Sequence, residues 1–208
     1  MKLYTFQTGE MSVNTYVFVN EETRLAVAFD VGGDASFLTL NELKYDFKIT
    51  DIILTHGHFD HIGGVYDFYK KGVKVHICEK EKDFINNSDL NLSSYFSSSV
   101  APFEIASYFS DGDLLKFNQM TFKVIETPGH TKGSCSFIID NYLITGDTLF
   151  NSSFGRTDFP TGDIKTLIKS IKKLFSLEND YIVLSGHGDR TMLSIERKNN
   201  PIKYYDNN

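Results

Sequence analysis

A dense group of histidine and aspartate side chains stands out in the first third of the sequence. The stretch "THGHFDH", residues 55–61, holds three of the chain's six histidines and one aspartate. Imidazole nitrogens and carboxylate oxygens are the ligands that zinc and similar divalent ions take in proteins. The pattern therefore predicts a metal site. Its candidate ligands are His56, His58, Asp60 and His61.

The spacing within this stretch divides the candidate ligands into two sets. The preceding residues, "DIILT", have the apolar pattern of a buried strand, and side chains two apart on an extended chain point the same way. His56 and His58 can therefore meet one ion, whereas on a helix, at about 100° per residue, they would lie roughly 200° apart. We expect a turn after Phe59 into a helix beginning near His61, which directs Asp60 and His61 away from the first pair.

Three more candidate ligands follow predicted strands later in the chain. His130 lies in "ETPGHTKGS", Asp147 in "YLITGDTLF" and His187 in "YIVLSGHGD". In each case a strand, a glycine and then a ligand type follow one another. A single such residue in a loop is usually only solvated, but three at equivalent strand ends, together with the histidine-rich stretch, indicate one shared site. His76 lies inside a predicted strand, so we expect a structural role for it, with a substrate contact as the alternative.

The elements that must position these residues mix strands and helices. Runs rich in β-branched and aromatic residues predict strands at 3–7, 14–19, 25–29, 51–54, 74–78, 114–117, 121–126, 135–139, 142–144 and 181–184. Apolar periodicity predicts helices at 34–47, 61–72, 163–175 and 190–201. Asp34 is the candidate N-cap of the first helix, and Pro201 would end the last. "FNQM" and "IIDNYLI" indicate hairpin turns, and the whole favours an α/β fold.

Composition restricts the classes of function. The 208 residues, 41% hydrophobic and 23% charged, suit a single domain spanning 1–208. A net charge of −6 without a basic run argues against nucleic-acid binding. No apolar run is long enough for a membrane span, and the N-terminus lacks the pattern of a signal peptide. Cys78 and Cys135 form no CxxC motif, so we expect a reduced, cytoplasmic setting.

The segment 88–110 has no clean periodicity. It is rich in serine and carries several aromatic residues. Two interpretations remain open. It could be a poorly ordered surface loop, or it could be a cap over the site, because long irregular insertions in compact domains are often lids.

Taken in order, "THGHFDH", "PGHTKGS", "GDTLF" and "GHG" closely resemble the motifs of the metallo-β-lactamase superfamily. The resemblance spans nearly the whole chain. It implies an α/β fold, an αββα four-layer sandwich of two mixed β-sheets flanked by helices, with the metal site at one edge of the sheets. It also implies two divalent metal ions, Zn²⁺ first, with iron or manganese as alternatives. One ion would take His56, His58 and His130, the second Asp60, His61 and His187, and Asp147 would bridge them.

Two adjacent metal ions predict a hydrolytic reaction. They lower the pKa of a shared water, so that hydroxide exists near neutral pH, and they hold the developing oxyanion. No protein nucleophile is then required, and the sequence contains neither GxSxG nor a Cys–His signature. Asp60 is the candidate to orient the hydroxide and take its proton.

His61 and the segment "GRTDFP" indicate which branches of the superfamily the chain resembles. The main class of zinc β-lactamases typically has another residue where His61 stands, whereas glyoxalase II, lactonase and RNase Z branches have histidine. "GRTDFP" is similar to the short glyoxalase II-like hydrolases, and an RNase Z exosite arm is not found. The resemblance therefore implies a small-molecule thioester substrate, S-lactoylglutathione or a related hydroxyacyl thioester. A thiolate also leaves without protonation near neutral pH, whereas an amine does not.

Arg156 and the end of the chain bear on the substrate. Only 21 residues follow His187, so we expect no C-terminal glutathione-binding helical domain. Arg156 could hold a substrate carboxylate through its planar guanidinium, and a structural pair with Asp158 is the alternative. Two other functions stay open, a mononuclear iron persulfide dioxygenase and a non-catalytic metal-binding module. The proline of "GRTDFP" and the lack of a cysteine before its glycine favour the hydrolase.

Overall fold

The structure is a computed structural model that describes residues 1–33 and 35–205, so the predicted N-cap Asp34 lies outside the described residues. The chain divides into two units. Unit 1 comprises Met1–Phe109 and Lys116–Thr121, and unit 2 comprises Ser110–Leu115 and Phe122–Asn208. Each unit is built on a mixed sheet with helices packed on it, which confirms the predicted fold class of two mixed sheets flanked by helices.

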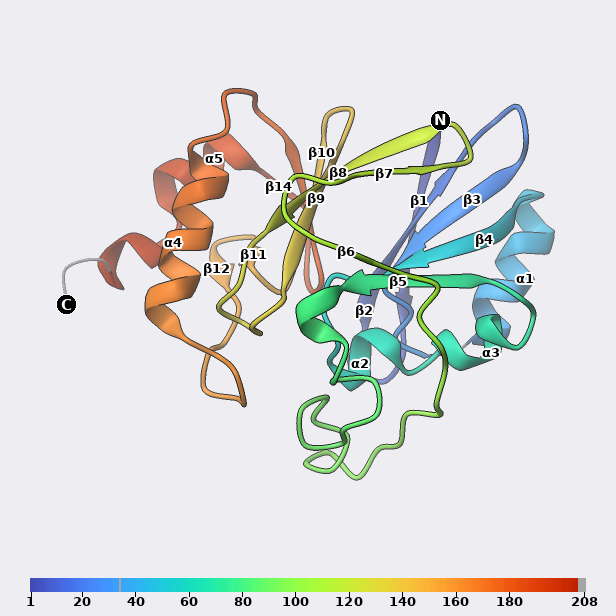
Figure 1. Ribbon diagram of the computed structural model, residues 1–208. Helices are drawn as coiled ribbons and strands as arrows, with labels where there is room; N and C mark the ends of the chain where they lie inside the picture. The colour runs from blue at the N-terminus through green and yellow to red at the C-terminus, as the bar shows by residue number, and fades with distance from the viewer. Residues whose placement is uncertain (34, 206–208) are drawn as a thin grey trace. The chain divides into compact units, whose positions relative to one another are not determined.

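Unit 1 contains a six-stranded sheet in the order β1-β2-β3-β4-β5-β6. Its strands are β1 (Lys2–Thr8), β2 (Val13–Val19), β3 (Leu25–Phe29), β4 (Lys48–Ile53), β5 (Lys74–Cys78) and β6 (Ser107–Phe109). Its helices are α1 (Ala35–Tyr45), α2 (Phe59–Ile62), α3 (Val65–Tyr69) and the 3-10 helix η1 (Glu79–Glu81). β1 to β3 are antiparallel neighbours, and β3 to β6 run parallel (Figure 1). The carboxyl ends of the parallel strands therefore meet at one edge of this sheet.

One apolar cluster joins the helices of unit 1 to their sheet. Leu38 of α1, Ile62 of α2 and Phe68 of α3 pack in it with the side chains of β2 to β5, and each is at most 1% exposed. Burying a side chain of this size contributes about 1.5–3 kcal/mol to folding. The short helix α2, which carries two of the candidate ligands, is thereby fixed to the sheet through Ile62.

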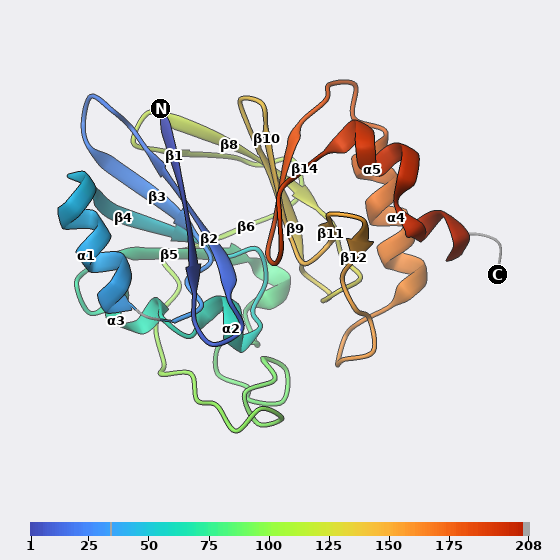
Figure 2. The ribbon, with the colours of Figure 1, turned by 180° about the vertical axis from the view of Figure 1, so that it is seen from behind.

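Unit 2 contains a second six-stranded sheet, in the order β14-β13-β10-β9-β8-β7, and a small two-stranded ribbon (Figure 2). Its strands are β7 (Leu114–Phe117), β8 (Met120–Glu126), β9 (Cys135–Ile139), β10 (Tyr142–Gly146), β11 (Leu149–Phe150), β12 (Ser153–Phe154), β13 (Ile182–Ser185) and β14 (Thr191–Met192), with the β7–β8 turn counted in unit 1. Its helices are α4 (Ile164–Phe175), α5 (Leu193–Asn199) and the 3-10 helix η2 (Pro201–Tyr205). Leu167, Ile171 and Leu174 of α4 pack with Leu193 of α5 against this sheet.

The ends of all predicted strands are confirmed to within three residues, and the short strands β6, β11, β12 and β14 were not predicted. Both hairpin turns are confirmed, with Asn118, Gln119 and Asp140 in the left-handed region. The helices predicted at 34–47, 163–175 and 190–201 correspond to α1, α4 and α5.

The helix predicted at 61–72 is wrong in two respects. It begins earlier, at Phe59, and it is divided into α2 and α3 at Gly63 and Gly64. The division is caused by Val31, in the loop after β3, which forms hydrogen bonds with main-chain groups of the helical stretch. The Val31 amide donates to the His61 carbonyl at 2.8 Å, and the Val31 carbonyl accepts from the Gly64 amide at 2.9 Å.

The segment 88–110 contains no helix and ends in the edge strand β6. Between β5 and β6 the chain leaves the sheet near α2 and returns along a long loop (Figures 1 and 2). Asn91 ties this loop together, because its side-chain amide donates to the Phe84 carbonyl at 2.9 Å and its side-chain oxygen accepts from the Ser93 amide at 3.0 Å. The loop is therefore a hydrogen-bonded structure.

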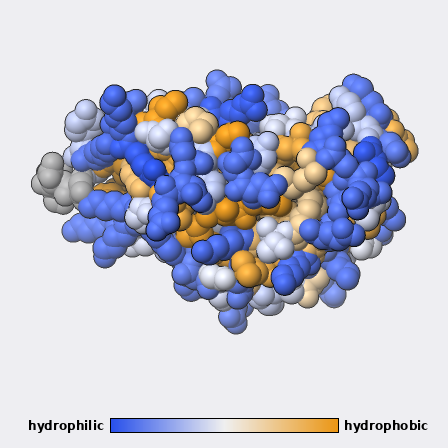
Figure 3. All heavy atoms as spheres, turned by 90° about the horizontal axis from the view of Figure 1, so that it is seen from above, coloured by the Kyte–Doolittle hydropathy of each residue, from blue (hydrophilic) through white to orange (hydrophobic). Residues whose placement is uncertain are grey.

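Hydrophilic and hydrophobic side chains both reach the surface of the protein (Figure 3). On the face drawn in Figure 3, hydrophilic side chains predominate and hydrophobic ones gather in patches between them. Among the helices of residues 1–33 and 35–205, none combines the length and the apolar character needed to cross a bilayer.

Candidate metal centre

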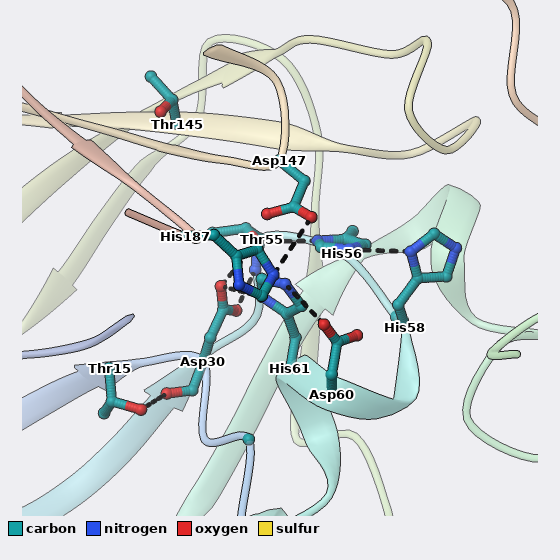
Figure 4. A network of polar contacts seen from close by, with 12 residues as sticks. Thr15, Asp30, Thr55, His56, His58, Asp60, His61, Thr145, Asp147 and His187 are labelled. Atoms are coloured by element: carbon teal, nitrogen blue, oxygen red, sulfur yellow. Dashed lines mark hydrogen bonds and ion pairs between the residues drawn. The ribbon is translucent and has the colours of Figure 1, made fainter. Parts of the chain in front are cut away.

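The unit 1 ligand group, defined as His56, His58, Asp60 and His61, lies at the carboxyl end of β4 and in the first turns of α2. The three histidines are at most 3% exposed. The Nε2 atom of His56 lies 3.1 Å from the Nδ1 atom of His58, and Figure 4 shows the two rings pointing toward each other. Two nitrogens bound to one tetrahedral ion at 2.0–2.1 Å lie about 3.3 Å apart. The spacing of this pair therefore fits two ligands of a single ion, as the alternation of side chains along a strand predicted.

The hydroxyl of Thr55 determines which ring nitrogen of His56 is left available as a candidate ligand atom. Its Oγ1 atom donates to the Oδ2 atom of Asp30 at 2.8 Å, and it lies 3.0 Å from Nδ1 of His56. Because the single hydroxyl hydrogen goes to the carboxylate, the hydroxyl oxygen accepts from the Nδ1–H group of His56. The lone pair of Nε2 is then directed toward His58, where a metal ion can use it.

Asp30 orients His61 in the same way. Its Oδ2 atom lies 2.8 Å from Nδ1 of His61, and its Oδ1 atom accepts from the Thr55 amide at 2.8 Å. The ring of His61 thus presents Nε2 on its far side, and that atom lies 3.8 Å from Oδ2 of Asp60. This distance is too long for a hydrogen bond and leaves room for an ion that binds both atoms. A carboxylate behind a ligating histidine is the usual support in metal sites.

Asp30 is itself held firmly. It is 2% exposed, its φ of +51° lies in the left-handed region, and its carbonyl accepts from the hydroxyl of Thr15 at 2.7 Å. Thr15 in turn lies within 2.9 Å of Thr8 through their Oγ1 atoms. A buried polar network therefore runs from the β1–β2 hairpin to two of the candidate ligands.

Glu81 fixes the main chain of the ligand stretch. It is fully buried in η1, and its Oε2 atom accepts from the Gly57 amide at 2.9 Å. A Cβ atom on Gly57 would lie 2.4 Å from Cβ of Phe84, so only glycine fits between His56 and His58. The stretch is also tied to the loop that follows, because the Phe59 amide donates to the Asn91 carbonyl at 2.8 Å.

The unit 2 ligand group, defined as His130, Asp147 and His187, is assembled from three loops. The loops follow β8, β10 and β13, which all run in one direction, because β8 and β10 are both antiparallel to β9 and β13 is parallel to β10. Oδ2 of Asp147 lies 3.6 Å from Nε2 of His130 and 3.6 Å from Nε2 of His187. These equal distances exceed hydrogen-bond length and fit a carboxylate oxygen that shares an ion with each histidine. The predicted meeting of three strand ends is thus found within unit 2.

Main-chain groups support this second group. Nδ1 of His130 lies 2.7 Å from the carbonyl oxygen of Arg156, so the Nδ1–H group donates and Nε2 is left to ligate. Gly155 passes directly over Asp147, because a Cβ atom there would lie 1.8 Å from the Asp147 carbonyl oxygen. Thr145 closes the turn that carries Asp147 by donating to the Leu149 carbonyl at 2.8 Å.

The guanidinium of Arg156 is paired with Asp158. Nε and Nη2 donate to the two carboxylate oxygens of Asp158 at 2.7 and 2.6 Å. The hydrogen bond from Arg156 is the largest of the effects that lower the pKa of Asp158 to about 2. The guanidinium also lies 3.9 Å from the centre of the Phe159 ring. The structural pair foreseen for this arginine is therefore present, and its substrate contact stays a prediction.

His76 has structural partners within unit 1. It is 4% exposed, with Nδ1 at 2.7 Å from the hydroxyl of Ser107 and Nε2 at 3.2 Å from Oδ1 of Asp51. Burial acts to raise the pKa of Asp51, but the hydrogen bonds from His76 and Thr50 together lower it. These contacts link β4, β5 and β6, which agrees with the structural role expected for His76.

Three residues that support the ligand groups are not among the candidates predicted from the sequence. Asp30 directly follows the strand 25–29, and the pattern of a strand followed by a carboxylate could have identified it. Thr55 stands next to His56, and a single hydroxyl in a loop carries no spacing pattern that could have identified it. Nothing in the spacing of Glu81 distinguishes it from the charged residues around it.

Comparison with known proteins decides the family. The sequence pattern of the metallo-β-lactamase superfamily matches residues 8–187. The chain belongs to the metallo-β-lactamase superfamily. The fold and the order of the metal-ligand motifs agree with this membership, which confirms the resemblance seen in the sequence.

Three relatives in the metallo-β-lactamase superfamily are informative. Hydroxyacylglutathione hydrolase GloC of Haemophilus influenzae is 34% identical over 187 residues, covering 87% of this chain and 88% of that protein. The crystal structure of BLEG-1 B3 metallo-β-lactamase has 34% identity and a TM-score of 0.90, covering 96% of this chain and 98% of the other. TTHA1623, solved in a di-iron-bound form, has 28% identity and a TM-score of 0.86, covering 95% and 98%.

These relatives differ in chemistry. One is a hydroxyacylglutathione hydrolase, one is a β-lactamase, and one holds two iron ions. Membership in the metallo-β-lactamase superfamily, together with the histidine and aspartate clusters described above, supports a metal-dependent hydrolase that binds divalent ions.

Proposed function

We propose that this protein is a dinuclear metal-dependent thioester hydrolase that acts on S-lactoylglutathione or a related hydroxyacyl thioester. One arrangement supports the proposal most strongly. In each of His56, His61 and His130, the ring nitrogen Nδ1 takes part in a hydrogen bond, which leaves Nε2 for a metal ion. Such support serves metal ligation. The 34% identity to a hydroxyacylglutathione hydrolase favours the thioester among the substrates of the superfamily.

The ligand assignment within this proposal joins the two groups. We assign one ion to His56, His58 and His130, the second to Asp60, His61 and His187, and the bridging position to Asp147. Zinc is the first choice of metal because every ligand is an imidazole or a carboxylate, and iron is the second because a relative at 28% identity holds it. When bound, the ions supply Lewis acidity, which makes water nucleophilic near neutral pH and polarises the acyl carbonyl.

The chain's own residues then orient the reactants. The carboxylate of Asp60, 14% exposed and at the first turn of α2, is placed to accept a proton from the attacking water and to hold that water toward the carbonyl carbon. The thiolate leaves without a proton. No side chain is therefore required as a general acid for the leaving group.

Arg156 is proposed to bind a substrate carboxylate at the same time as Asp158. A guanidinium has five N–H donors, and Asp158 takes one on Nε and one on Nη2. Three donors remain for a carboxylate such as those of glutathione. The pair with Asp158 holds the side chain in one orientation, which lowers the entropy lost on binding.

Metal content paired with a substrate panel tests the proposal. We expect about two zinc ions per chain and hydrolysis of S-lactoylglutathione. One iron per chain with oxygen uptake on glutathione persulfide would overturn it in favour of a persulfide dioxygenase. Hydrolysis of a β-lactam without thioester hydrolysis would overturn the substrate assignment. A metal-loaded protein inert toward thioesters, lactones, β-lactams and persulfides would favour a non-catalytic metal-binding module.

A further inference from the structure

A cavity of about 300 Å³ opens beside Asp60 within unit 1. This volume is at the lower end of the range of roughly 300–1,000 Å³ that small-molecule sites span. Its walls come from the β1–β2 turn at Gly9 to Met11, from the loop after β3, from the start of α2, and from residues 96–99 of the segment between β5 and β6. The cavity is thus next to a proposed catalytic carboxylate and is large enough for one arm of a substrate.

Two phenylalanine rings form one side of this cavity. Phe59, directly before Asp60, and Phe96 are stacked, with ring centres 5.1 Å apart and planes inclined by 28°. Phe96 is 45% exposed, so much of its surface is open to a ligand. An aromatic pair of this kind is an attractive surface for a flat apolar group, because offset stacking adds to the burial of apolar area.

The charges around the cavity are negative. Among the described residues, its lining includes the acidic residues Glu10 and Asp60 and no lysine, arginine or histidine. An anionic group placed there would be repelled by Glu10, whose charge is not offset by a cationic side chain among the described lining residues. A hydroxyl group of a ligand finds polar neighbours there, because Ser98 and Ser99 also line the cavity. The chemistry therefore fits an uncharged group that combines an apolar, flat part with a hydroxyl.

The position of Phe96 is set by the loop that carries it. The Tyr95 amide donates to the Leu92 carbonyl at 3.0 Å, and the Ser98 amide donates to the Ser93 carbonyl at 3.0 Å. The same loop is tied to the ligand stretch through the hydrogen bond from the Phe59 amide to the Asn91 carbonyl. The loop thus holds Phe96 against Phe59, the residue before Asp60, and a specificity residue requires such a defined position.

From these observations we infer that the cavity receives the acyl group of the substrate and that Phe96 selects flat, uncharged 2-hydroxyacyl groups. This inference rests on the proposed thioester hydrolase function. It assigns to residues 88–110 a defined role: a wall of the acyl pocket. It also ranks the acyl groups: an aryl hydroxyacyl group is favoured over a methyl one of the same charge, and a succinyl group is disfavoured.

A pair of thioesters that differ only in the acyl side chain tests the inference. S-mandeloylglutathione carries a phenyl ring where S-lactoylglutathione carries a methyl group. In the zinc-loaded protein, Phe96→Ala should lower kcat/KM for the mandeloyl substrate by about 3- to 10-fold, the range expected from one aromatic contact. The lactoyl substrate should change by less than about twofold. Phe96→Leu, which keeps apolar bulk without the ring, should give an intermediate loss.

A matched control and a charge variant complete the design. Tyr95→Ala removes a neighbouring exposed ring that does not line the cavity, and it should leave the mandeloyl-to-lactoyl ratio unchanged. Glu10→Gln should raise kcat/KM for a succinyl thioester of glutathione more than for the lactoyl one. Equal losses on both substrates in Phe96→Ala, or the same ratio shift in Tyr95→Ala, would overturn the inference.

Binding of thioethers separates this inference from the proposed function. S-(2-hydroxy-2-phenylethyl)glutathione and S-(2-hydroxypropyl)glutathione lack the scissile carbonyl, so their affinities do not depend on turnover. If the wild-type protein hydrolyses neither thioester, the proposed function fails. Weaker binding of only the phenyl thioether in Phe96→Ala would then still support the pocket, and equal binding of both thioethers in both proteins would refute it.

Discussion

The two ligand groups are supported in different ways. In unit 1, two buried carboxylates provide the support: Asp30 contacts His61 and Thr55, and Glu81 binds the Gly57 amide. In unit 2, main-chain atoms take that role, with the Arg156 carbonyl behind His130. Unit 1 gathers four candidate ligands from six consecutive residues, whereas unit 2 gathers three from loops far apart in the chain.

This difference indicates which side-chain substitutions will disturb each ligand group. A side chain that orients a ligand can be removed by mutation, but a carbonyl oxygen is present whatever residue occupies the position. We therefore expect the unit 1 group to be sensitive to changes in residues that do not bind metal. The unit 2 group should be sensitive to changes that move its main chain.

The largest effect should come from Asp147→Ala, which removes the proposed bridge. Because the loss of a supporting contact alone weakens metal sites by about 10- to 100-fold, the loss of a shared ligand should exceed about 100-fold in activity. Metal analysis should find both ions lost or one weakly held. Two retained ions with normal turnover would show that Asp147 does not bridge.

Gly155→Ala tests the importance of the main chain in unit 2. The new Cβ atom cannot coexist with the Asp147 carbonyl oxygen, 1.8 Å away, so the loop must move and displace the carbonyl behind His130. We expect metal affinity to fall on the order of 100-fold. Gly112→Ala is the control: Gly112 has a φ of +84°, and the added methyl group would have no heavy atom within 4 Å, so only backbone strain of roughly 1–2 kcal/mol is introduced.

Asp30→Asn tests the side-chain support in unit 1. The new amide nitrogen cannot accept from both Thr55 and His61, so the ring of His61 loses its orientation. We predict a metal affinity about 10- to 100-fold weaker, measured by competition with a chelator. Asp51→Asn offers a matched comparison, because it removes the charge from a similar buried contact, to His76, outside the ligand group. If both variants weakened metal binding equally, the loss would be one of general stability.

Arg156→Ala should weaken substrate binding and leave metal binding unchanged. The carbonyl that supports His130 remains, so the metal content should stay the same. KM for thioesters that carry a carboxylate should rise on the order of tenfold, which corresponds to about 1.4 kcal/mol. An unchanged KM would leave this arginine with only its structural pair to Asp158.

The smallest effect concerns the pH dependence of the Arg156–Asp158 pair. The pKa of Asp158 is lowered to about 2 in the folded protein, below the value near 3.9 of an unfolded aspartate. Its contribution to stability is therefore present above about pH 4 and disappears as the pH falls through 2. The small difference in thermal midpoint between wild type and Asp158→Asn at pH 7 should vanish at pH 2. A difference that persists at pH 2 would point to an uncharged contact.

Much of the fold and of the ligand groups was predictable because the signals are local. Alternation along "DIILTHGH" places His56 and His58 on one side of the chain, and the glycine after each of three strands marks the loops of unit 2. The division of the helical stretch into α2 and α3 was not predictable in this way. It depends on hydrogen bonds between that stretch and Val31, which belongs to a distant part of the sequence, and periodicity does not report such contacts.

The residues that hold the candidate ligands in place could not be predicted from local patterns either. Glu81 and Asn91 act on the ligand stretch only because the chain after β5 folds back against it. The cavity beside Asp60 likewise combines residues from four segments, so neither its volume nor its stacked rings could be derived from spacing. Short edge strands such as β6 were missed because three residues carry too little pattern.

The main-chain carbonyl of Arg156 has an evolutionary consequence. Because it aims the His130 ring through an atom that every amino acid possesses, the side chain at position 156 can vary while the ring keeps its hydrogen bond. If Arg156 binds the substrate as proposed, selection can then change how a substrate is held while His130 keeps this hydrogen bond. A scaffold built in this way offers a route by which descendants of one enzyme come to act on different acyl compounds.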